Sequence, residues 1–295
     1  MSLEPVPEMM RHARSHRYAV GYFESWNIES LYGVIDAAEQ TRSPIIIGFN
    51  GEFLSRADRA ASERLALYGA LGKAAATTTT VPCGFIFNEC PRDEWTREAI
   101  TAGFNLVMPA DPDAPPARYA ERVTAITKVA HANSVAVEAQ IGELPVCVGG
   151  KEHRGGSETR AADAKAFVAE TGVDLLAVSV GNVHFAHGET HCLDFKRLAE
   201  IHAAVDTPLV LHGGTGIAGD DVGKAISFGV TKVNFGTYVK QRYLAAIRAA
   251  IQSDETDPHE LIGTGGAHDI LVAGRRAVRE AVLERLPALN SAGKA

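Results

Sequence analysis

The segment PLVLHGGTGIAGDDVGKAISFGVTKVNFGT (208–237) contains one complete strand–helix–strand unit. Its apolar run PLVLH ends in His212, and two glycines follow directly before a helical pattern and a second run, TKVNF (231–235). This order of buried strand, potential ligand and flexible turn is expected where a parallel barrel or open sheet builds a binding site. Taken alone, the glycines are equally compatible with an ordinary strand-to-helix turn that has a histidine at its start.

Short apolar runs of this kind recur along the chain, and each is followed by a helical pattern. They do not alternate strictly between apolar and polar residues, which is typical of parallel strands buried on both faces. Eight such units without a break in composition predict an α/β fold, a (β/α)8 TIM barrel, as one domain over residues 1–295. A doubly wound sheet is the alternative, but no GxGxxG turn follows the first run. The runs are YAVGYF (18–23), PIIIGF (44–49), VPCGFIF (81–87), NLVMP (105–109), SVAVEA (134–139), DLLAVSV (174–180), PLVLH (208–212) and TKVNF (231–235).

One long stretch, GELPVCVGGKEHRGGSE (142–158), is rich in glycine and has no period. Long loops in compact domains are usually functional or disordered, so we interpret this stretch as a mobile loop above the barrel.

The composition excludes several classes of protein. With 46% hydrophobic and 22% charged residues, the chain of 295 residues can bury a large core. A net charge of −7 without a dense basic stretch argues against a nucleic-acid partner. No apolar run is long enough to span a membrane, and the first residues lack the apolar region of a signal peptide. The four cysteines form no CxxC pair, so we expect reduced thiols and a cytoplasmic location.

Polar residues accumulate where the predicted strands end, and in a barrel the chemistry belongs at these carboxyl ends. His184 and His212 are one strand–helix–strand step apart and could form half of a zinc site, completed by a carboxylate from Glu89 or Glu138. The alternative is that one of the histidines only bonds a backbone carbonyl at the rim. The strand-end residues are Glu24, Asn50, Asn88, Glu89, Glu138, Gln140, His184, His212, Asn234 and Thr237.

Two glycine-rich pieces, HGGTG (212–216) and NFGT (234–237), follow the last two runs. Backbone amides in such turns bind phosphate well, and the ends of strands seven and eight are the recurrent phosphate site of a TIM barrel. Both pieces at the expected strands, beside two histidines, indicate a phosphate-bearing ligand.

The order GNVH (181–184), LHGGTGI (211–217), NFGTYVK (234–240) and NSAGKA (290–295) resembles the class II, metal-dependent ketose-bisphosphate aldolases. The similarity extends over nearly the whole chain, from YAVGYFESWNIESL to FVAETGVDLLAVSVGNVH. It implies a lyase that cleaves or forms a C–C bond in a ketose or ketose phosphate through a metal-stabilised enediolate. It also implies one divalent metal ion, with Zn expected first and Mn or Mg as alternatives. We expect a sugar or sugar-phosphate substrate and a homo-oligomer, a dimer or tetramer.

The resemblance also assigns residues. His184 and His212 match two zinc ligands of the family, and Glu152 in GGKEH matches its acid/base glutamate. The expected substrate- and phosphate-binding residues are Asn50, Gly213, Gly214, Thr215, Asn234, Gly236 and Thr237.

Three departures from the family pattern concern the site itself. Asn88 and Glu89 replace an Asp-His pair, Gln140 replaces a glutamate near the metal, and Glu24 replaces an asparagine. Glu89 can serve as third metal ligand through oxygen, which shifts the preference toward Mn²⁺ or Mg²⁺. Asn88 cannot act as a general base, so the catalytic proton must pass to Glu152, which we expect first, or to Glu24 or Glu89.

These departures leave two alternatives to an aldolase of ketoses. One is a related metal-dependent enzyme that acts on another hydroxy-keto or hydroxy-acid substrate. The other is a sugar-phosphate-binding protein that has lost catalysis. We expect weak or absent cleavage of fructose 1,6-bisphosphate, because Asn88 stands where the family's proton-handling aspartate would be.

Overall fold

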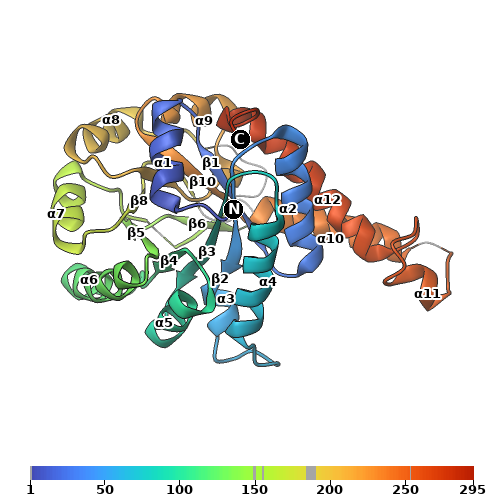
Figure 1. The fold of residues 1–295 in the computed structure, drawn as a ribbon. Coiled ribbons are helices and arrows are strands. Elements are labelled where there is room, and N and C mark those ends of the chain that lie inside the picture. Colours follow the sequence, from blue (N-terminus) through green and yellow to red (C-terminus); the bar gives the residue numbers. More distant parts are fainter. Residues whose placement is uncertain (1, 149–150, 155, 184–190, 253) are drawn as a thin grey trace.

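The predicted barrel is confirmed by a computed structural model, in which eight parallel strands close on themselves (Figure 1). The structure describes residues 2–148, 151–154, 156–183, 191–252 and 254–295, and for 146–148 and 151–154 only the backbone. The strands follow one another around the barrel in chain order, so each predicted unit contributes one strand. They are β1 (Val20–Ser25), β2 (Ile45–Asn50), β3 (Cys83–Cys90), β4 (Leu106–Pro109), β5 (Ala136–Ile141), β8 (Leu175–Val178), β9 (Leu209–Leu211) and β10 (Val230–Phe235).

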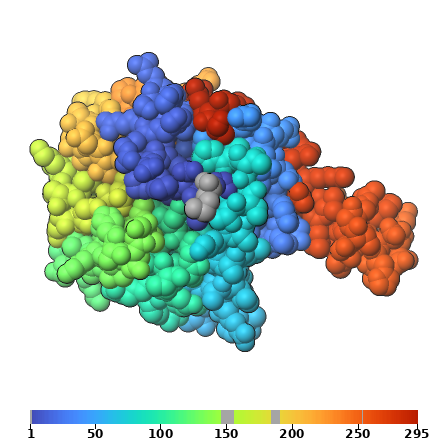
Figure 2. All heavy atoms as spheres, viewed as in Figure 1, coloured from blue at the N-terminus to red at the C-terminus, as the bar shows by residue number. Residues whose placement is uncertain are grey.

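Helices connect the strands and cover the outside of the barrel. Around it lie α2 (Ile28–Thr41), α3 (Gly51–Ser55), α4 (Leu65–Thr78), α5 (Asp93–Ala102), α6 (Pro116–Ala132), α7 (Ala161–Thr171), α8 (Phe195–Ala204), α9 (Gly219–Ile226) and α10 (Thr237–Ile251). The remaining elements are α1 (Val6–Ser15), α11 (Pro258–Leu261), α12 (Ile270–Arg285) and the 3₁₀ turns η1 (Gly214–Gly216) and η2 (Leu286–Leu289). The far part of α10, α11 and the start of α12 project from the barrel as an arm (Figure 2).

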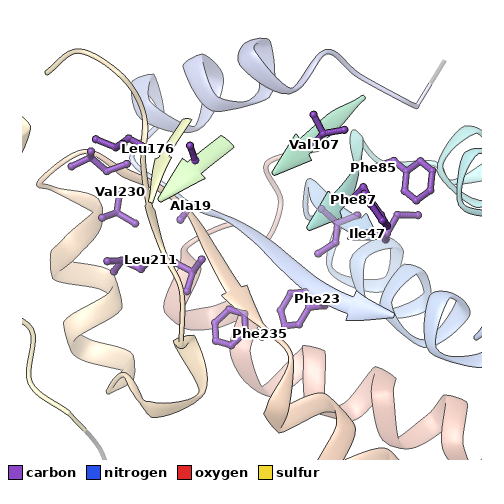
Figure 3. Close-up of a cluster of buried hydrophobic side chains, with 14 of the residues drawn as sticks. Ala19, Phe23, Ile47, Phe85, Phe87, Val107, Leu176, Leu211, Val230 and Phe235 are labelled. Carbon is purple, nitrogen blue, oxygen red and sulfur yellow. The ribbon is translucent and has the colours of Figure 1, made fainter. Parts of the chain in front are cut away.

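The core has two layers because successive side chains of a strand point to opposite faces. Phe23, Ile47, Phe85 and Phe235 pack between the strands and the outer helices (Figure 3). The residues next to them in sequence form a second apolar cluster inside the barrel, where side chains of α1 close the amino-terminal end. This inner cluster includes Val6, Met9, Met10, Val20, Tyr22, Ile46, Ile86, Leu106, Ala136, Leu175 and Val210.

A capping box fixes the turn between β1 and α2. The Asn27 side chain accepts a hydrogen bond from the Ser30 backbone N–H at 2.9 Å, and the Ser30 hydroxyl accepts one from the Asn27 N–H at 3.0 Å. Reciprocal bonds of this kind define where a helix begins. The end of β1, which carries Glu24, is therefore held close to the first turn of α2.

The interpretation of 142–158 as a loop is wrong for residues 146–148 and 151–154, whereas its mobility stays a prediction. Strands β6 (Val146–Val148) and β7 (Lys151–Arg154) pair antiparallel as a two-stranded sheet. Glu143 and Ser157 exchange two backbone hydrogen bonds of 2.8 Å and so extend the hairpin at its base. Ladder bonds satisfy backbone groups that an open loop would leave to water.

The sequence predicts no membrane-spanning segment, and this can be compared with the helices of the structure. Within residues 2–148, 151–154, 156–183, 191–252 and 254–295, no helix combines the length and the apolar character that crossing a membrane requires.

Candidate active site

The inward-facing side chains change from apolar to polar along the strands. Residues separated by two positions share a face, so the inward set can be counted from the apolar cluster toward the carboxyl ends. At those ends the inward positions are polar, and the barrel therefore has a polar mouth. The polar residues in this register are Glu24, Asn50, Asn88, Glu138, His212, Lys232 and Asn234.

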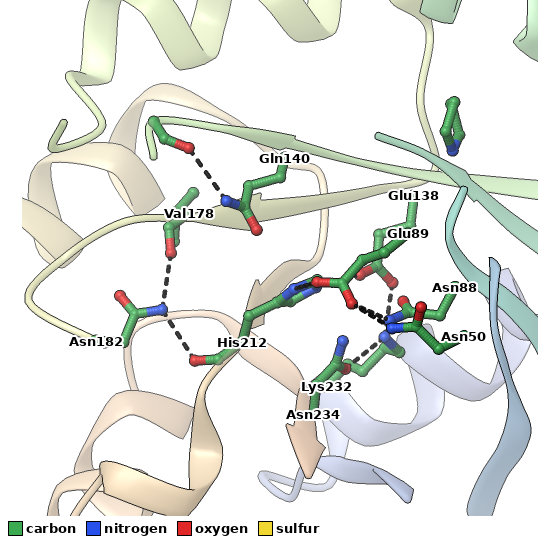
Figure 4. A network of polar contacts seen from close by, with 12 residues as sticks. Asn50, Asn88, Glu89, Glu138, Gln140, Val178, Asn182, His212, Lys232 and Asn234 are labelled. Carbon is green, nitrogen blue, oxygen red and sulfur yellow. Dashed lines mark hydrogen bonds and ion pairs between the residues drawn. The ribbon is translucent and has the colours of Figure 1, made fainter. Parts of the chain in front are cut away.

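His212, directly after β9, lies between two carboxylates (Figure 4). Its Nε2 is 2.9 Å from Glu138 Oε1, and its Nδ1 is 3.0 Å from Glu89 Oε1. The imidazole is 1% exposed. Burial alone would lower the pKa of His212, but the hydrogen bonds and charges of the two carboxylates outweigh it and raise the pKa above its ordinary value. A proton on both ring nitrogens, or a cation at one of them, is what this arrangement favours.

Glu138 also forms a fully buried ion pair with Lys232 of β10. Its Oε2 is 2.8 Å from Lys232 Nζ, an electrostatic contact without good hydrogen-bond alignment, and Nζ donates to Asn234 Oδ1 at 2.6 Å. Burial would raise the pKa of Glu138, but Lys232 and His212 hold it below its usual value. Burial lowers the pKa of Lys232 despite the neighbouring Glu138. Acidic and basic side chains thus alternate from Glu89 through His212 and Glu138 to Lys232.

A local irregularity of β3 brings Glu89 to the mouth. Because Glu89 follows the inward-facing Asn88, a regular strand would direct the Glu89 side chain away from the interior. The pairing of β3 with β4, however, shifts between Phe87 and Cys90. Glu89 itself has a φ of +52°, in the left-handed region. Its Oε2 then accepts N–H bonds from Asn50 at 2.9 Å and from Asn88 at 3.0 Å. A non-glycine residue in this conformation costs on the order of 1–3 kcal/mol. Such strained residues are more common at functional sites than elsewhere.

Two asparagines at the mouth have amide orientations set by charged partners. Glu89 can only accept, so Asn88 must present its Nδ2, and Lys232 can only donate, so Asn234 must present its Oδ1. The other halves, Asn88 Oδ1 and Asn234 Nδ2, are buried and have no hydrogen-bond partner in the part of the chain that the structure describes. One acceptor and one donor are therefore available to a ligand.

The glycine turns after β9 and β10 lie against each other. Gly213 has a φ of +68°, and a Cβ there would collide with the Val183 carbonyl. The Thr215 hydroxyl accepts from the Tyr238 backbone N–H at 3.3 Å and so joins the two turns. Gly236 precedes α10 and cannot cap it with a side chain. The other backbone amides at the start of this long helix, beside a glycine-rich turn, are well suited to an anion.

Glu24, at the end of β1, lies between β2, which carries Asn50, and β10, which carries Asn234. It forms an ion pair with Lys240 of α10, and its Oε2 occupies the space that a Cβ at Gly236 would need. Burial raises the pKa of Glu24, and Lys240 opposes this effect. The structure thus places Glu24 over the start of α10, where it is 8% exposed.

The donors around His212 fit a divalent cation. In the tautomer with the proton on Nε2, His212 donates a hydrogen bond to Glu138 and Nδ1 is the ligating nitrogen, as in many histidine–metal sites. Nδ1 and Glu89 Oε1 are 3.0 Å apart, close to the roughly 3.3 Å that separates two donors on one tetrahedral zinc ion. Within the described ranges no three side chains of the ligating types meet around one point. His184, the expected further ligand, lies outside the described residues.

The remaining predicted residues can be placed in part. Glu152 lies in β7, and its side chain is outside the described part of the structure. Gln140 donates to the Gly142 carbonyl at 3.2 Å and belongs to the strand end rather than to the His212 cluster. Sequence reasoning missed Lys232 and Lys240. Lys232 had a signal: a lysine in the apolar run TKVNF, two positions from Asn234 and hence on the same face.

Comparisons with known proteins agree with this architecture. Residues 4–294 match the family model described as "Fructose-bisphosphate aldolase class-II", a family that is generally dependent on a divalent metal ion. The fructose-bisphosphate aldolase of Geobacillus stearothermophilus is 31% identical over 100% of this chain and 99% of its own. The Bacillus subtilis (strain 168) protein named "Probable fructose-bisphosphate aldolase" is 33% identical over the full length of both chains.

Solved structures give the same result. The YdjI aldolase from Escherichia coli K12 is 29% identical and has a TM-score of 0.81, with 99% of each chain covered. The predicted resemblance to class II aldolases is therefore confirmed, and with it the expectation of an aldolase at the level of the family. The chain belongs to the class-II fructose-bisphosphate aldolase family.

Proposed function

We propose that this protein is a class II aldolase that cleaves or forms the C–C bond of a ketose or ketose phosphate through an enediolate. The single observation that carries the proposal is the Glu138–His212–Glu89 array at the carboxyl ends of the strands. It combines an oriented nitrogen ligand with an anionic oxygen ligand beside two uncommitted amide groups. Barrel enzymes carry their catalytic groups at this end.

The proposed metal ligands are His212 through Nδ1, Glu89 through its carboxylate, and His184. Zn²⁺ is expected first, and the oxygen ligand makes Mn²⁺ or Mg²⁺ the alternatives. When bound, such an ion polarises the substrate carbonyl and stabilises the negative charge of the enediolate.

The protein's own groups then bind and orient the substrate. Asn88 Oδ1 accepts a hydrogen bond from a substrate hydroxyl, and Asn234 Nδ2 donates one to a substrate oxygen. Asn50 holds Glu89 in position through its 2.9 Å bond. A phosphate binds to the backbone and hydroxyl groups of the two glycine turns: Gly213, Gly214, Thr215, Gly236 and Thr237.

Proton transfer requires a carboxylate, because the Asn88 amide cannot take the proton of the reacting hydroxyl. We propose Glu152 in the hairpin for this role, since the charge of Glu24 is already engaged by Lys240. Glu152→Gln should lower kcat about 10²–10⁴-fold and change the pH–rate profile. Near-full turnover with an unchanged profile would transfer the role to Glu24, which Glu24→Gln tests in the same assay.

A ketose other than fructose 1,6-bisphosphate is the favoured substrate. The Asn88–Glu89 pair supports this choice, because it removes the aspartate on which the usual proton transfer depends. A kcat on the bisphosphate equal to that of ordinary family members would contradict it. The non-catalytic alternative, a sugar-phosphate-binding protein, predicts no turnover of any ketose phosphate even in the presence of added Zn²⁺ or Mn²⁺.

Metal content and turnover test the proposal together. Elemental analysis of the purified protein should find one divalent metal per subunit, and His212→Ala should lose it together with turnover on a panel of ketose phosphates. His131→Ala is the matched control, because His131 also contacts a carboxylate, Asp174, at 2.9 Å but outside the barrel mouth. Unchanged metal in His212→Ala would exclude the assignment. Light scattering tests the accompanying proposal of a homo-oligomer, a dimer or tetramer, and cell fractionation tests the proposed cytoplasmic location.

A further inference from the structure

A cavity of about 250 Å³ lies beside the His212 cluster, at the ends of β1 and β2 and near the first turns of α10. Asn50 belongs to both places, because it lines the cavity and donates its Nδ2 to Glu89 at 2.9 Å. Glu24, which also lines the cavity, lies against Gly236 at the start of α10. A molecule bound at the mouth of the barrel can therefore extend into this cavity without leaving the protein surface.

The charges around the cavity are already paired. Glu24 pairs with Lys240, and Glu63 pairs with Arg59. The Lys240 ammonium also lies 4.2 Å from the centre of the Phe53 ring, and Arg59 donates to the Phe53 carbonyl at 2.9 Å. Formal charges cancel, and among the described lining residues both cations have carboxylate partners. A phosphate entering the cavity would have to compete with Glu24 for Lys240 and would be repelled by the Glu24 carboxylate.

The rest of the lining suits an uncharged polar chain. Trp26, Phe53 and Tyr68 provide aromatic walls. The Ser25 hydroxyl is 1% exposed and has no hydrogen-bond partner among the residues that the structure describes. The Glu24 carboxylate can accept hydrogen bonds. Aromatic walls with a few convergent polar groups are typical of sites for small ligands, and here these groups match hydroxyls.

We propose that this cavity binds the end of the substrate distal to the glycine turns, and that this end is an uncharged chain bearing hydroxyl groups. The inference rests on the proposed aldolase function and names its substrate class: ketose monophosphates, with the single phosphate at the glycine turns. Glu24 is the residue that selects against a second phosphate.

Two substrates that differ only at the distal end test the selection directly. The enzyme should use D-fructose 1-phosphate with a kcat/KM more than tenfold higher than D-fructose 1,6-bisphosphate. Glu24→Gln keeps the size of the side chain and removes its charge, so this ratio should fall at least tenfold as the bisphosphate improves. Asp36→Asn is the matched control, because it removes a carboxylate paired with Arg275 at 2.6 Å outside the barrel mouth, and it should leave the ratio unchanged.

A second variant tests the hydroxyl preference in the direction of condensation. With dihydroxyacetone phosphate as donor, Ser25→Ala should lower kcat/KM for D-glyceraldehyde about three- to tenfold relative to propionaldehyde, which lacks the hydroxyls. An equal effect on both aldehydes would show that Ser25 contacts no hydroxyl of the acceptor, contrary to the proposal.

Binding separates this inference from the proposed function, because hexitol phosphates have no carbonyl and cannot react. By calorimetry, the purified metal-containing protein should bind hexitol 1-phosphate more than tenfold tighter than hexitol 1,6-bisphosphate. This preference without turnover of either ketose would overturn the proposed function and support the cavity assignment. Equal or tighter binding of the bisphosphate, or binding of neither, would overturn the cavity assignment. So would turnover that favours the bisphosphate.

Discussion

The two ends of the barrel interior are built on the same strands and the same inward register, yet they have opposite chemistry. At the amino-terminal end, Met9 and Met10 of α1 belong to one apolar cluster with Val20 and Ile86. At the carboxyl end the inward positions carry polar side chains, among them Glu138, His212 and Lys232. Lys232, whose Nζ lies 5.1 Å from the centre of the Tyr22 ring, marks the boundary between them. The apolar end stabilises the fold and carries none of the proposed catalytic groups. The protein can therefore tolerate the unfavourable burial of ionisable groups at the mouth.

The largest expected effect comes from breaking the ion pair at the mouth. Glu138→Gln leaves Lys232 buried without a counter-charge, and the free energy of unfolding should fall by about 3–5 kcal/mol. Urea unfolding measures it. Glu280→Gln, in an exposed pair with Arg279, is the control and should cost less than about 1 kcal/mol. A similarly small loss for Glu138→Gln would mean that Lys232 is uncharged in the folded protein.

Shortening a side chain at the amino-terminal end tests whether the two ends of the barrel are independent. Met10→Ala removes a side chain with no exposed surface and should lower the free energy of unfolding by about 3 kcal/mol through the cavity that it leaves. The kinetic constants of the folded enzyme and its metal content should stay unchanged. A several-fold drop in kcat measured well below the unfolding transition would show that the two ends are coupled.

The smallest change in stability is expected at Glu89, together with a loss of function. Glycine adopts a φ of +52° without strain, so Glu89→Gly should alter the free energy of unfolding by no more than about 1 kcal/mol while metal content falls. Arg42→Gly is the control, at a left-handed residue that ends α2, and it should keep the metal. Retention of the metal by Glu89→Gly would contradict the ligand assignment.

The strands were predictable from the sequence because apolar runs in a parallel barrel are buried on both faces. Counting in twos from those runs also predicts that Glu24, Glu138 and His212 reach the mouth. Counting alone fails at Glu89, where the register shift and the left-handed φ depend on pairing with β4. It also gives no partner for Lys232, because the pair with Glu138 forms across the barrel between strands that are not adjacent in the sheet.

The short hairpin was missed for a related reason. Strands β6 and β7 are three and four residues long and lie among glycines, so their composition is that of a loop. Only the pairing between them, together with the Glu143–Ser157 backbone bonds, makes the stretch regular. Movement of this hairpin during catalysis remains a prediction.

The contact between Glu24 and Gly236 constrains how these two positions change in evolution. The Glu24 carboxylate fills the space of a Cβ at position 236, so the two positions are coupled, although the whole barrel lies between them in sequence. A side chain at 236 requires the Glu24 side chain to move or to be shortened, and movement would weaken its ion pair with Lys240. Among relatives, we therefore expect a side chain at 236 to accompany a smaller or differently oriented residue at 24.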